Sequence, residues 1–374
     1  MRTTFVALVG LCAASLAMGC DEDKKPTETA PSATAATPSA SAASTTAPAP
    51  KPAAGEVITK SIKSAVDAWN AHDAAKVASL YQPTGKLVIP AFPDFSGRDA
   101  IATEAKANFT AYSDFKVAVT RSFIKGNTAV FEWVVTGKND GPLMGKAASG
   151  RPIGIVGASA VTYDDDGLVK EEHRYFDLPT IMSQVDPKAK AGTFRAPIAL
   201  PTAATETHVS KGTPDEAKTI DQGNAILKAD ESKDEKALMA TVTDDYVWEE
   251  GTAPGPTKTA DLKGVMASYD KAFPDFTLPV TMTMAADGYY VVEAAFKGTQ
   301  KGAMGPLKAS NKPVNMRMVD IQLLKDGKAS KEWSYANSAE MLIQIGAMPP
   351  IPAAPAGAAS GAPSAAPAPA AKPK

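Results

Sequence analysis

The stretch Glu171-Glu-His-Arg-Tyr-Phe-Asp-Leu-Pro-Thr-Ile-Met-Ser-Gln-Val-Asp186 returns in related form 160 residues later, as Lys331-Glu-Trp-Ser-Tyr-Ala-Asn-Ser-Ala-Glu-Met-Leu-Ile-Gln-Ile-Gly346. In this alignment Tyr175 matches Tyr335 and Asp177 matches Asn337. Each copy passes from a strand-like alternation into a short apolar helix. The chain therefore contains an internal repeat, and this segment is expected to close each copy.

One face of this last strand carries side chains that suit a binding or catalytic site. Successive residues of a strand point to opposite faces, so His173, Tyr175 and Asp177 share one face and Arg174 and Phe176 the other. We expect the His173 face to line a cavity. The residues expected to bind a ligand are Phe131, Trp133 and Tyr175 in the first copy and Trp333, Tyr335 and Asn337 in the second.

The amino terminus has the layout of an export signal. Residues 1–19 contain one arginine, an apolar run and small residues before Cys20. The ending Leu16-Ala-Met-Gly-Cys20 resembles the lipobox of bacterial lipoproteins, with Ala17 where that family prefers leucine. This resemblance implies that Cys20 is the lipidated first residue of the mature protein. We therefore expect an exported lipoprotein anchored to a membrane, on the periplasmic or cell-surface side.

Composition excludes several classes of function. The only other cysteine, Cys12, lies inside the signal segment, so the mature chain has no pair for a disulfide. The formal net charge of −2 gives no basic surface for nucleic acid. Residues 20–55 and 348–374 consist largely of Ala, Pro, Thr and Ser and are expected to be a disordered tether and tail.

The remaining residues predict two α+β domains in tandem, at 56–187 and 211–347, with a linker rich in Ala, Pro and Thr at 188–210. Helical spacing, turn signals and strand alternation give the same order in both: helix, helix, strand, helix, four strands and a final short helix. In the first copy Asp73 should cap the second helix. We expect two separate units, each with its own core, and a linker open to proteases.

This order, with the last-strand pattern Gly167-x-Val-x-Glu-x-His-x-x-x-Asp177, is similar to that of the SnoaL-like proteins of the nuclear-transport-factor-two-like superfamily. The resemblance covers both copies. It implies two cone-shaped domains, each a curved antiparallel sheet packed on helices around an apolar pocket. In the polyketide cyclases of the family an Asp near the end of a late strand acts as general acid/base, aided by a His, and Asp177 matches that Asp. His173 is the candidate partner because it shares the face of Asp177.

A structural role for Asp177 is equally concrete. It precedes Leu178-Pro179 at a helix start, and its counterpart opens Asn337-Ser-Ala-Glu340, which is a capping-box pattern. Asp and Asn serve alike as helix caps but not as proton carriers. For Glu132 and Glu293, which share a register in mid-strand, we expect a solvated outer face.

The sequence offers no metal or cofactor site. His72 and His208 fall in a helix junction and the linker, apart from His173, and Asp164-Asp-Asp166 is best explained as a hairpin tip. Three functions remain open: binding of a small apolar molecule near a membrane, acid/base catalysis at Asp177 with the second copy inactive, and an interaction scaffold. In the scaffold the cones pair, within the chain or between chains, and their own side chains fill the pockets. A cavity of about 300 Å³ or more would favour the first two.

Overall fold

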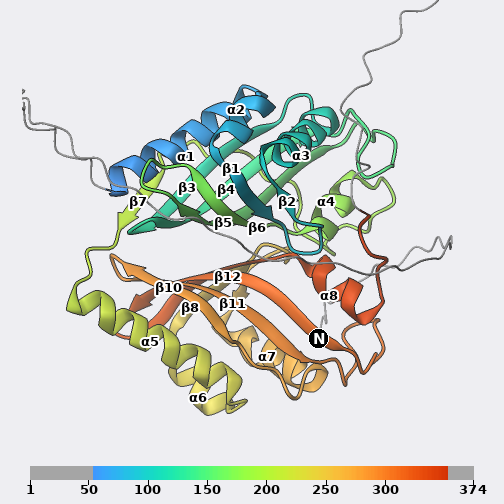
Figure 1. Cartoon of the computed structure of the whole chain (residues 1–374). Helices are drawn as coiled ribbons and strands as arrows, with labels where there is room; N and C mark the ends of the chain where they lie inside the picture. Colours follow the sequence, from blue (N-terminus) through green and yellow to red (C-terminus); the bar gives the residue numbers. More distant parts are fainter. Residues whose placement is uncertain (1–53, 353–374) are drawn as a thin grey trace, which may run out of the picture. The chain divides into compact units, whose positions relative to one another are not determined.

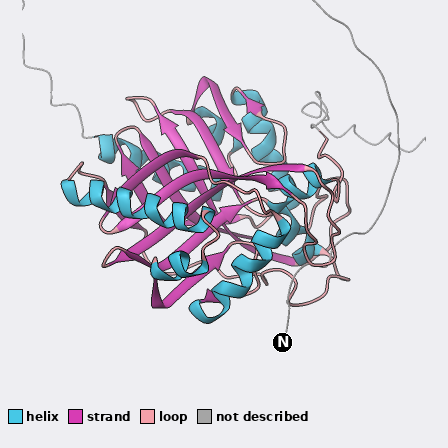
Figure 2. Ribbon diagram, turned by 90° about the horizontal axis from the view of Figure 1, so that it is seen from below, coloured by secondary structure: helices cyan, strands magenta, loops and turns pink. Residues whose placement is uncertain are grey.

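The computed structural model describes residues 54–352, all of which fall within one compact unit of the chain. The expected signal segment, Cys20 and nearly all of the tether and tail lie outside these residues. Within 54–352, no helix combines the length and apolar character that crossing a membrane would require. Figure 1 labels most of the helices and strands, and Figure 2 gives a second view of them.

The first repeat, residues 54–185, has the predicted order of elements. Its helices are α1 (Ala54–Asn70), α2 (Ala74–Ser79), α3 (Arg98–Ala111) and α4 (Leu178–Val185). Its strands are β1 (Tyr81–Val88), β2 (Phe95–Ser96), β3 (Lys116–Lys125), β4 (Thr128–Lys138), β5 (Pro152–Tyr163) and β6 (Val169–Tyr175). Local signals explain the helix starts, because Asp73 accepts a hydrogen bond from the Lys76 amide and Asp177 one from the Thr180 amide.

The second repeat, residues 214–345, follows the same order. Its helices are α5 (Pro214–Glu231), α6 (Glu235–Ala240), α7 (Thr259–Ala272) and α8 (Ser338–Ile345). Its strands are β8 (Val242–Glu250), β9 (Thr257–Lys258), β10 (Val280–Ala286), β11 (Tyr289–Thr299), β12 (Pro313–Lys325) and β13 (Lys328–Ala336). A capping box at Thr213 and Glu216 begins α5.

Each repeat contributes one open sheet. The first has the order β2-β1-β6-β5-β4-β3-β7, in which β7 (Glu206–Val209) comes from the segment after the first repeat. The second has the order β10-β11-β12-β13-β8-β9. The hairpins are antiparallel, as expected, but β1 pairs with β6 and β8 pairs with β13 in parallel. A parallel pair needs a long connection, and in each repeat one helix and four strands lie between the partners.

The buried apolar side chains of the described residues form four clusters. One lies in the first repeat between its sheet and α1 to α3, and two smaller clusters lie in the second repeat. The remaining cluster takes side chains from both sheets: Phe123, Val130, Ala158, Ala160 and Tyr175 with Met284, Val291, Val319, Ile321 and Tyr335. The expectation of separate units was therefore wrong, because a face of each sheet is buried against the other repeat.

The segment predicted to be a linker is packed against both repeats. Its β7 (Glu206–Val209) pairs in parallel with β3 at the edge of the first sheet. Upstream, the Ile198 amide donates to the carbonyl of Gly154, and the Arg195 amide donates to the carbonyl of Thr252 in the second repeat. These contacts correct the expectation of an open tether.

Candidate functional site

A cavity of about 680 Å³ lies in the first repeat, between its helices and the inner face of its sheet. The walls are mostly apolar and include Trp69 of α1, Phe131 and Trp133 of β4, and Phe176. Two residues that follow the last helix of the second repeat, Ile351 and Pro352, also line it. The cavity is therefore built mainly by the first repeat and completed by a segment far away in sequence.

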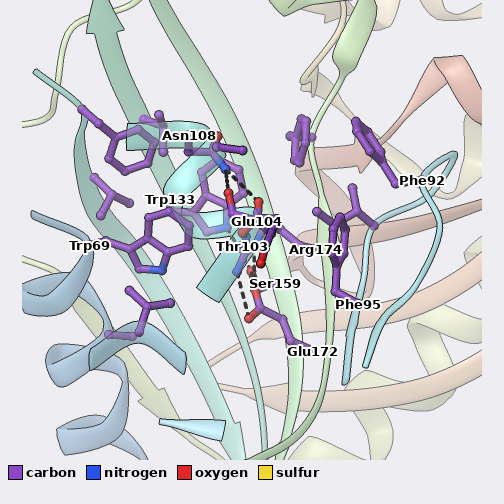
Figure 3. Close-up of a pocket in the computed structure, with 18 of the residues that line it drawn as sticks. Trp69, Phe92, Phe95, Thr103, Glu104, Asn108, Trp133, Ser159, Glu172 and Arg174 are labelled. Atoms are coloured by element: carbon purple, nitrogen blue, oxygen red, sulfur yellow. Dashed lines mark hydrogen bonds and ion pairs between the residues drawn. The ribbon is translucent and has the colours of Figure 1, made fainter. Parts of the chain in front are cut away.

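A polar cluster forms one side of this cavity, shown in Figure 3. The Arg174 guanidinium donates to Glu172 from Nε at 2.8 Å and from Nη2 at 3.1 Å, and its Nη1 lies 3.3 Å from Glu104. Tyr81 and Ser159 both donate their hydroxyl protons to Glu172. Strand β6 supplies Glu172 and Arg174, whereas α3 supplies Glu104.

The two carboxylates of this cluster have different electrostatic environments. Burial raises the pKa of Glu172, but the Arg174 charge and hydrogen bonds from Arg174, Tyr81 and Ser159 outweigh it, so the net pKa is lowered. Burial also raises the pKa of Glu104, and its attraction to Arg174 and a hydrogen bond from Asn108 do not offset this. Arg174 lies closer to Glu172, so Glu104 is the cavity carboxyl that takes up a proton more readily.

The structure corrects the choice of face on β6. Of the residues predicted to bind a ligand, Phe131 and Trp133 line the cavity. His173, Tyr175 and Asp177 do not, because Glu172, Arg174 and Phe176 on the opposite face point into it. In the second repeat, Trp333, Tyr335 and Asn337 also lie away from this cavity.

The His173 face instead makes polar contacts with the second repeat. His173 lies 2.6 Å from Glu293 through Nδ1 and 2.8 Å from Glu171 through Nε2, and Tyr175 donates to Glu293. A hydrogen bond to Glu293 is the main cause that raises the pKa of His173 to about 9, against an opposing effect of burial. Histidine is thus held as a cation between two carboxylates.

The reciprocal contact joins the second repeat to the first. Tyr335 donates to Glu132, which also accepts from Arg121 through Nη2 at 2.7 Å. The Arg121 guanidinium lies 3.6 Å from the ring centre of Trp333. Glu132 is 2% exposed and Glu293 8%, so the expected solvated face for these residues was wrong.

Asp177 and Asn337 each cap two helices. Asp177 accepts from the Thr180 amide of its own α4 and from the Ser338 amide of α8. Asn337 accepts from the Ala339 amide of its own α8 and from the Leu178 amide of α4. The expected capping box is not formed, because the Asn337 side chain accepts from the Ala339 amide and the Glu340 carboxylate binds Arg317. Both residues hold the two repeats together.

The cluster of Glu104, Glu172 and Arg174 was missed by sequence reasoning. A signal was available in β6, where Glu172, Arg174 and Phe176 alternate with an equally polar set on the other face. In addition, no group of His, Cys, Asp or Glu among residues 54–352 is arranged to hold a metal ion.

Comparison with known families supports the architecture. The model of the SnoaL-like domain matches residues 62–172, and the model of the SnoaL-like polyketide cyclase matches residues 224–345. The chain therefore belongs to the SnoaL-like family, with two domains in tandem. Among curated proteins, none matches the sequence.

Solved structures resemble single repeats. AclR from Streptomyces galilaeus is 22% identical, with a TM-score of 0.34, and the match covers 37% of this chain and 86% of AclR. IdmH from Streptomyces antibioticus is 20% identical, with a TM-score of 0.32 and coverage of 34% and 99%. TsrD from Streptomyces laurentii is 18% identical, with a TM-score of 0.33 and coverage of 36% and 100%.

Proposed function

We propose that the first repeat binds a small, mainly apolar molecule with one polar group. The cavity carries this proposal, because its volume of about 680 Å³ exceeds the roughly 300 Å³ typical of ligand sites. The apolar walls bury the body of the ligand, and Glu104 and Arg174 meet its polar end. The same volume argues against a scaffold with filled pockets.

We propose further that the chain is exported and held at a membrane by a lipid on Cys20. The signal-like residues 1–19 and the lipobox resemblance support this, and both lie outside the described residues. Replacing Cys20 by Ser should move the protein from the membrane fraction to the soluble fraction. A variant that still sediments with membranes, with no lipid mass on the native amino-terminal peptide, would contradict the anchor.

Native mass spectrometry of the purified protein, with a search for a co-purified small molecule, tests the binding proposal. The chain produced from Asp21 onward keeps the whole described unit and is suited to solution work. We expect this chain to bind the apolar dye 1-anilinonaphthalene-8-sulfonate. In Ala65→Trp the new ring would occupy the cavity and abolish dye binding. The control Lys60→Trp changes an exposed position of the same helix, outside the cavity, and should bind as the parent does.

An acid/base enzyme is the second candidate, and Glu104 is the observation that favours it. A carboxyl whose pKa is raised by burial, in a cavity beside a fixed cation, suits proton transfer next to a carbonyl group. In this version Glu104 takes the role that the family resemblance gave to Asp177. The test is deuterium exchange at the acidic carbon of 2-tetralone in D₂O, which Glu104→Gln should abolish. If the parent protein exchanges the deuterium no faster than buffer alone does, the enzyme proposal is contradicted and binding remains the proposed function.

A further inference from the structure

The interiors of the two repeats differ in charge at corresponding positions. In the first, β5 and β6 place Ser159 opposite Arg174, and Arg174 neutralises Glu172. In the second, β12 and β13 place Asp320 opposite Ser334, while Glu332 keeps the position of Glu172. The second repeat has therefore lost the cation and gained an acid. This difference does not depend on the function proposed for the first repeat.

Four acidic side chains meet around this place, contributed by different elements. Asp320 lies on β12 and Glu332 on β13, with Asp230 near the end of α5 and Glu250 at the end of β8. Within residues 54–352 none of the four forms a salt bridge with a lysine or arginine. The cations that act nearby are Arg195, which attracts Glu250, and Lys233, which attracts the neighbouring Asp270.

Several oxygen acceptors at this place lack hydrogen-bond partners. Gln322 is 1% exposed. Its side-chain amide group donates a hydrogen bond to Glu332, whereas its Oε1 has no hydrogen-bond partner. Asp320 is 3% exposed, and its Oδ1 is also without a partner, as is Oδ1 of Asp230. A buried acceptor left unsatisfied costs free energy. Because all three are acceptors, the missing component is a donor, and the acids favour a positively charged one.

The surroundings favour an organic cation over a metal ion. No His, Cys, Asp or Glu group among the described residues has a metal-binding arrangement. Tyr246, which donates to Glu332 at 2.7 Å, and Trp248, which donates to Ser334, place aromatic rings beside the acids. Rings and carboxylates together suit an alkylammonium group. Trp248 and Met266 pack against this core and are themselves half buried.

Titration behaviour agrees with a missing cation. Burial raises the pKa of Glu332 to about 8, and repulsion by Asp320 and Asp230 adds to this. Burial likewise raises the pKa of Asp320 to about 6, and that of Asp230 and Glu250 to about 7 each. The other titratable groups here are Tyr246, Tyr269 and Tyr290, whose pKa values burial also raises. Without a cation, Glu332 holds a proton at neutral pH.

We propose that the interior of the second repeat binds a small alkylammonium ion, with Asp320 and Glu332 supplying the negative charge and Gln322 an acceptor. Binding requires Glu332 to ionise, so the ligand displaces the proton of Glu332. In the first repeat Arg174 occupies the equivalent place permanently.

The test is a thermal melt of the chain from Asp21 at pH 7.5 with n-butylammonium chloride, against NaCl at equal ionic strength and against n-butanol. We expect only the ammonium salt to raise the melting temperature, and calorimetric titration in buffers of different ionisation heat should show proton release. Glu332→Gln should remove the effect. Asp244→Asn, at an exposed acid of β8, should keep it.

Ser334→Arg gives a second, independent variant, because it places the cation of the first repeat at the matching position. We expect it to fold, and its melting temperature should no longer respond to n-butylammonium. The proposal is overturned if NaCl raises the melting temperature of the parent as much as n-butylammonium does. It is also overturned if the ammonium response persists in both Glu332→Gln and Ser334→Arg.

Discussion

Tyr175 of the first repeat donates a hydrogen bond to Glu293 of the second, with 2.6 Å between the phenol and carboxylate oxygens. Tyr335, which occupies the same position in the second repeat, donates in turn to Glu132 of the first. Each final strand thus supplies a tyrosine to the mid-strand glutamate of the other repeat. Such reciprocity is the pattern of a twofold-symmetric dimer interface, here formed within one chain.

Removing either hydroxyl should destabilise the protein. In Tyr175→Phe a buried carboxylate loses a donor, which costs about 1.5–3 kcal/mol in the free energy of unfolding. Tyr335→Phe should cost a similar amount, since Glu132 loses a donor but keeps Arg121. Urea unfolding measures both. The matched control is Tyr112→Phe, because that buried hydroxyl has no partner, so its loss should cost nothing. Equal effects at all three positions would contradict the reciprocal contact.

Asp177→Asn should cost about 1–3 kcal/mol in the free energy of unfolding, because the amide leaves buried donors unpaired. Asp177 accepts on one oxygen from the Thr180 amide and hydroxyl and on the other from those of Ser338. Asparagine replaces one of these oxygens by a donor. Burial raises the pKa of Asp177, so loss of its charge returns part of the cost.

The control for this variant is Asp73→Asn. Asp73 caps α2 at an exposed site, accepting from the Lys76 amide on one oxygen. Asparagine can supply that oxygen, so the change should stay within about 0.5 kcal/mol. At such an exposed cap we expect Asp and Asn to serve alike. A neutral Asp177→Asn would show that α8 does not depend on this cap.

His173 should make stability depend on pH. Its pKa rises from 6.5 to about 9, chiefly through the hydrogen bond to Glu293. Because the folded value lies above the unfolded one, the contribution is complete below pH 6.5 and disappears as the pH rises to 9. Ring-proton NMR should therefore place its titration above that of a free histidine.

The variant Glu293→Gln isolates this effect. It removes the main partner, so the titration of His173 should move toward lower pH, while Glu171 remains as the second neighbour. Denaturant unfolding between pH 6.5 and pH 9 should then show a weaker decline with pH than the parent does. An unchanged His173 titration in Glu293→Gln would rule out this pairing.

Limited proteolysis of the native chain should leave one resistant block that spans residues 188–210. The hydrogen bonds of β7 to β3 and of Arg195 to the second repeat protect this segment. The same protease should cut it readily after denaturation in urea. Two stable fragments separated within 188–210, produced under native conditions, would show that these contacts are not maintained.

Features that depend on neighbouring residues were predicted well from the sequence, whereas contacts between residues distant in sequence were not. The caps at Asp73 and Asp177 were predicted correctly, since a few neighbouring residues determine them. The face of β6 that lines the cavity was not predicted correctly. Alternation of polar and apolar residues distinguishes the two faces of a strand only when one face meets solvent. In β6 one face meets the helices and the other meets the second sheet, so both carry buried polar residues.

The segment after α8 should control access to the cavity. Ile351 and Pro352 line it together with residues of the first repeat, and Ile351 is half buried there. Ending the chain after Met348 removes this wall. We expect the affinity for 1-anilinonaphthalene-8-sulfonate to fall roughly fivefold, corresponding to about 1 kcal/mol of lost apolar contact. Ending the chain after Pro352 is the control, because every described wall of the cavity remains. Equal affinities of the two shortened chains would show that Ile351 and Pro352 do not contact the bound dye.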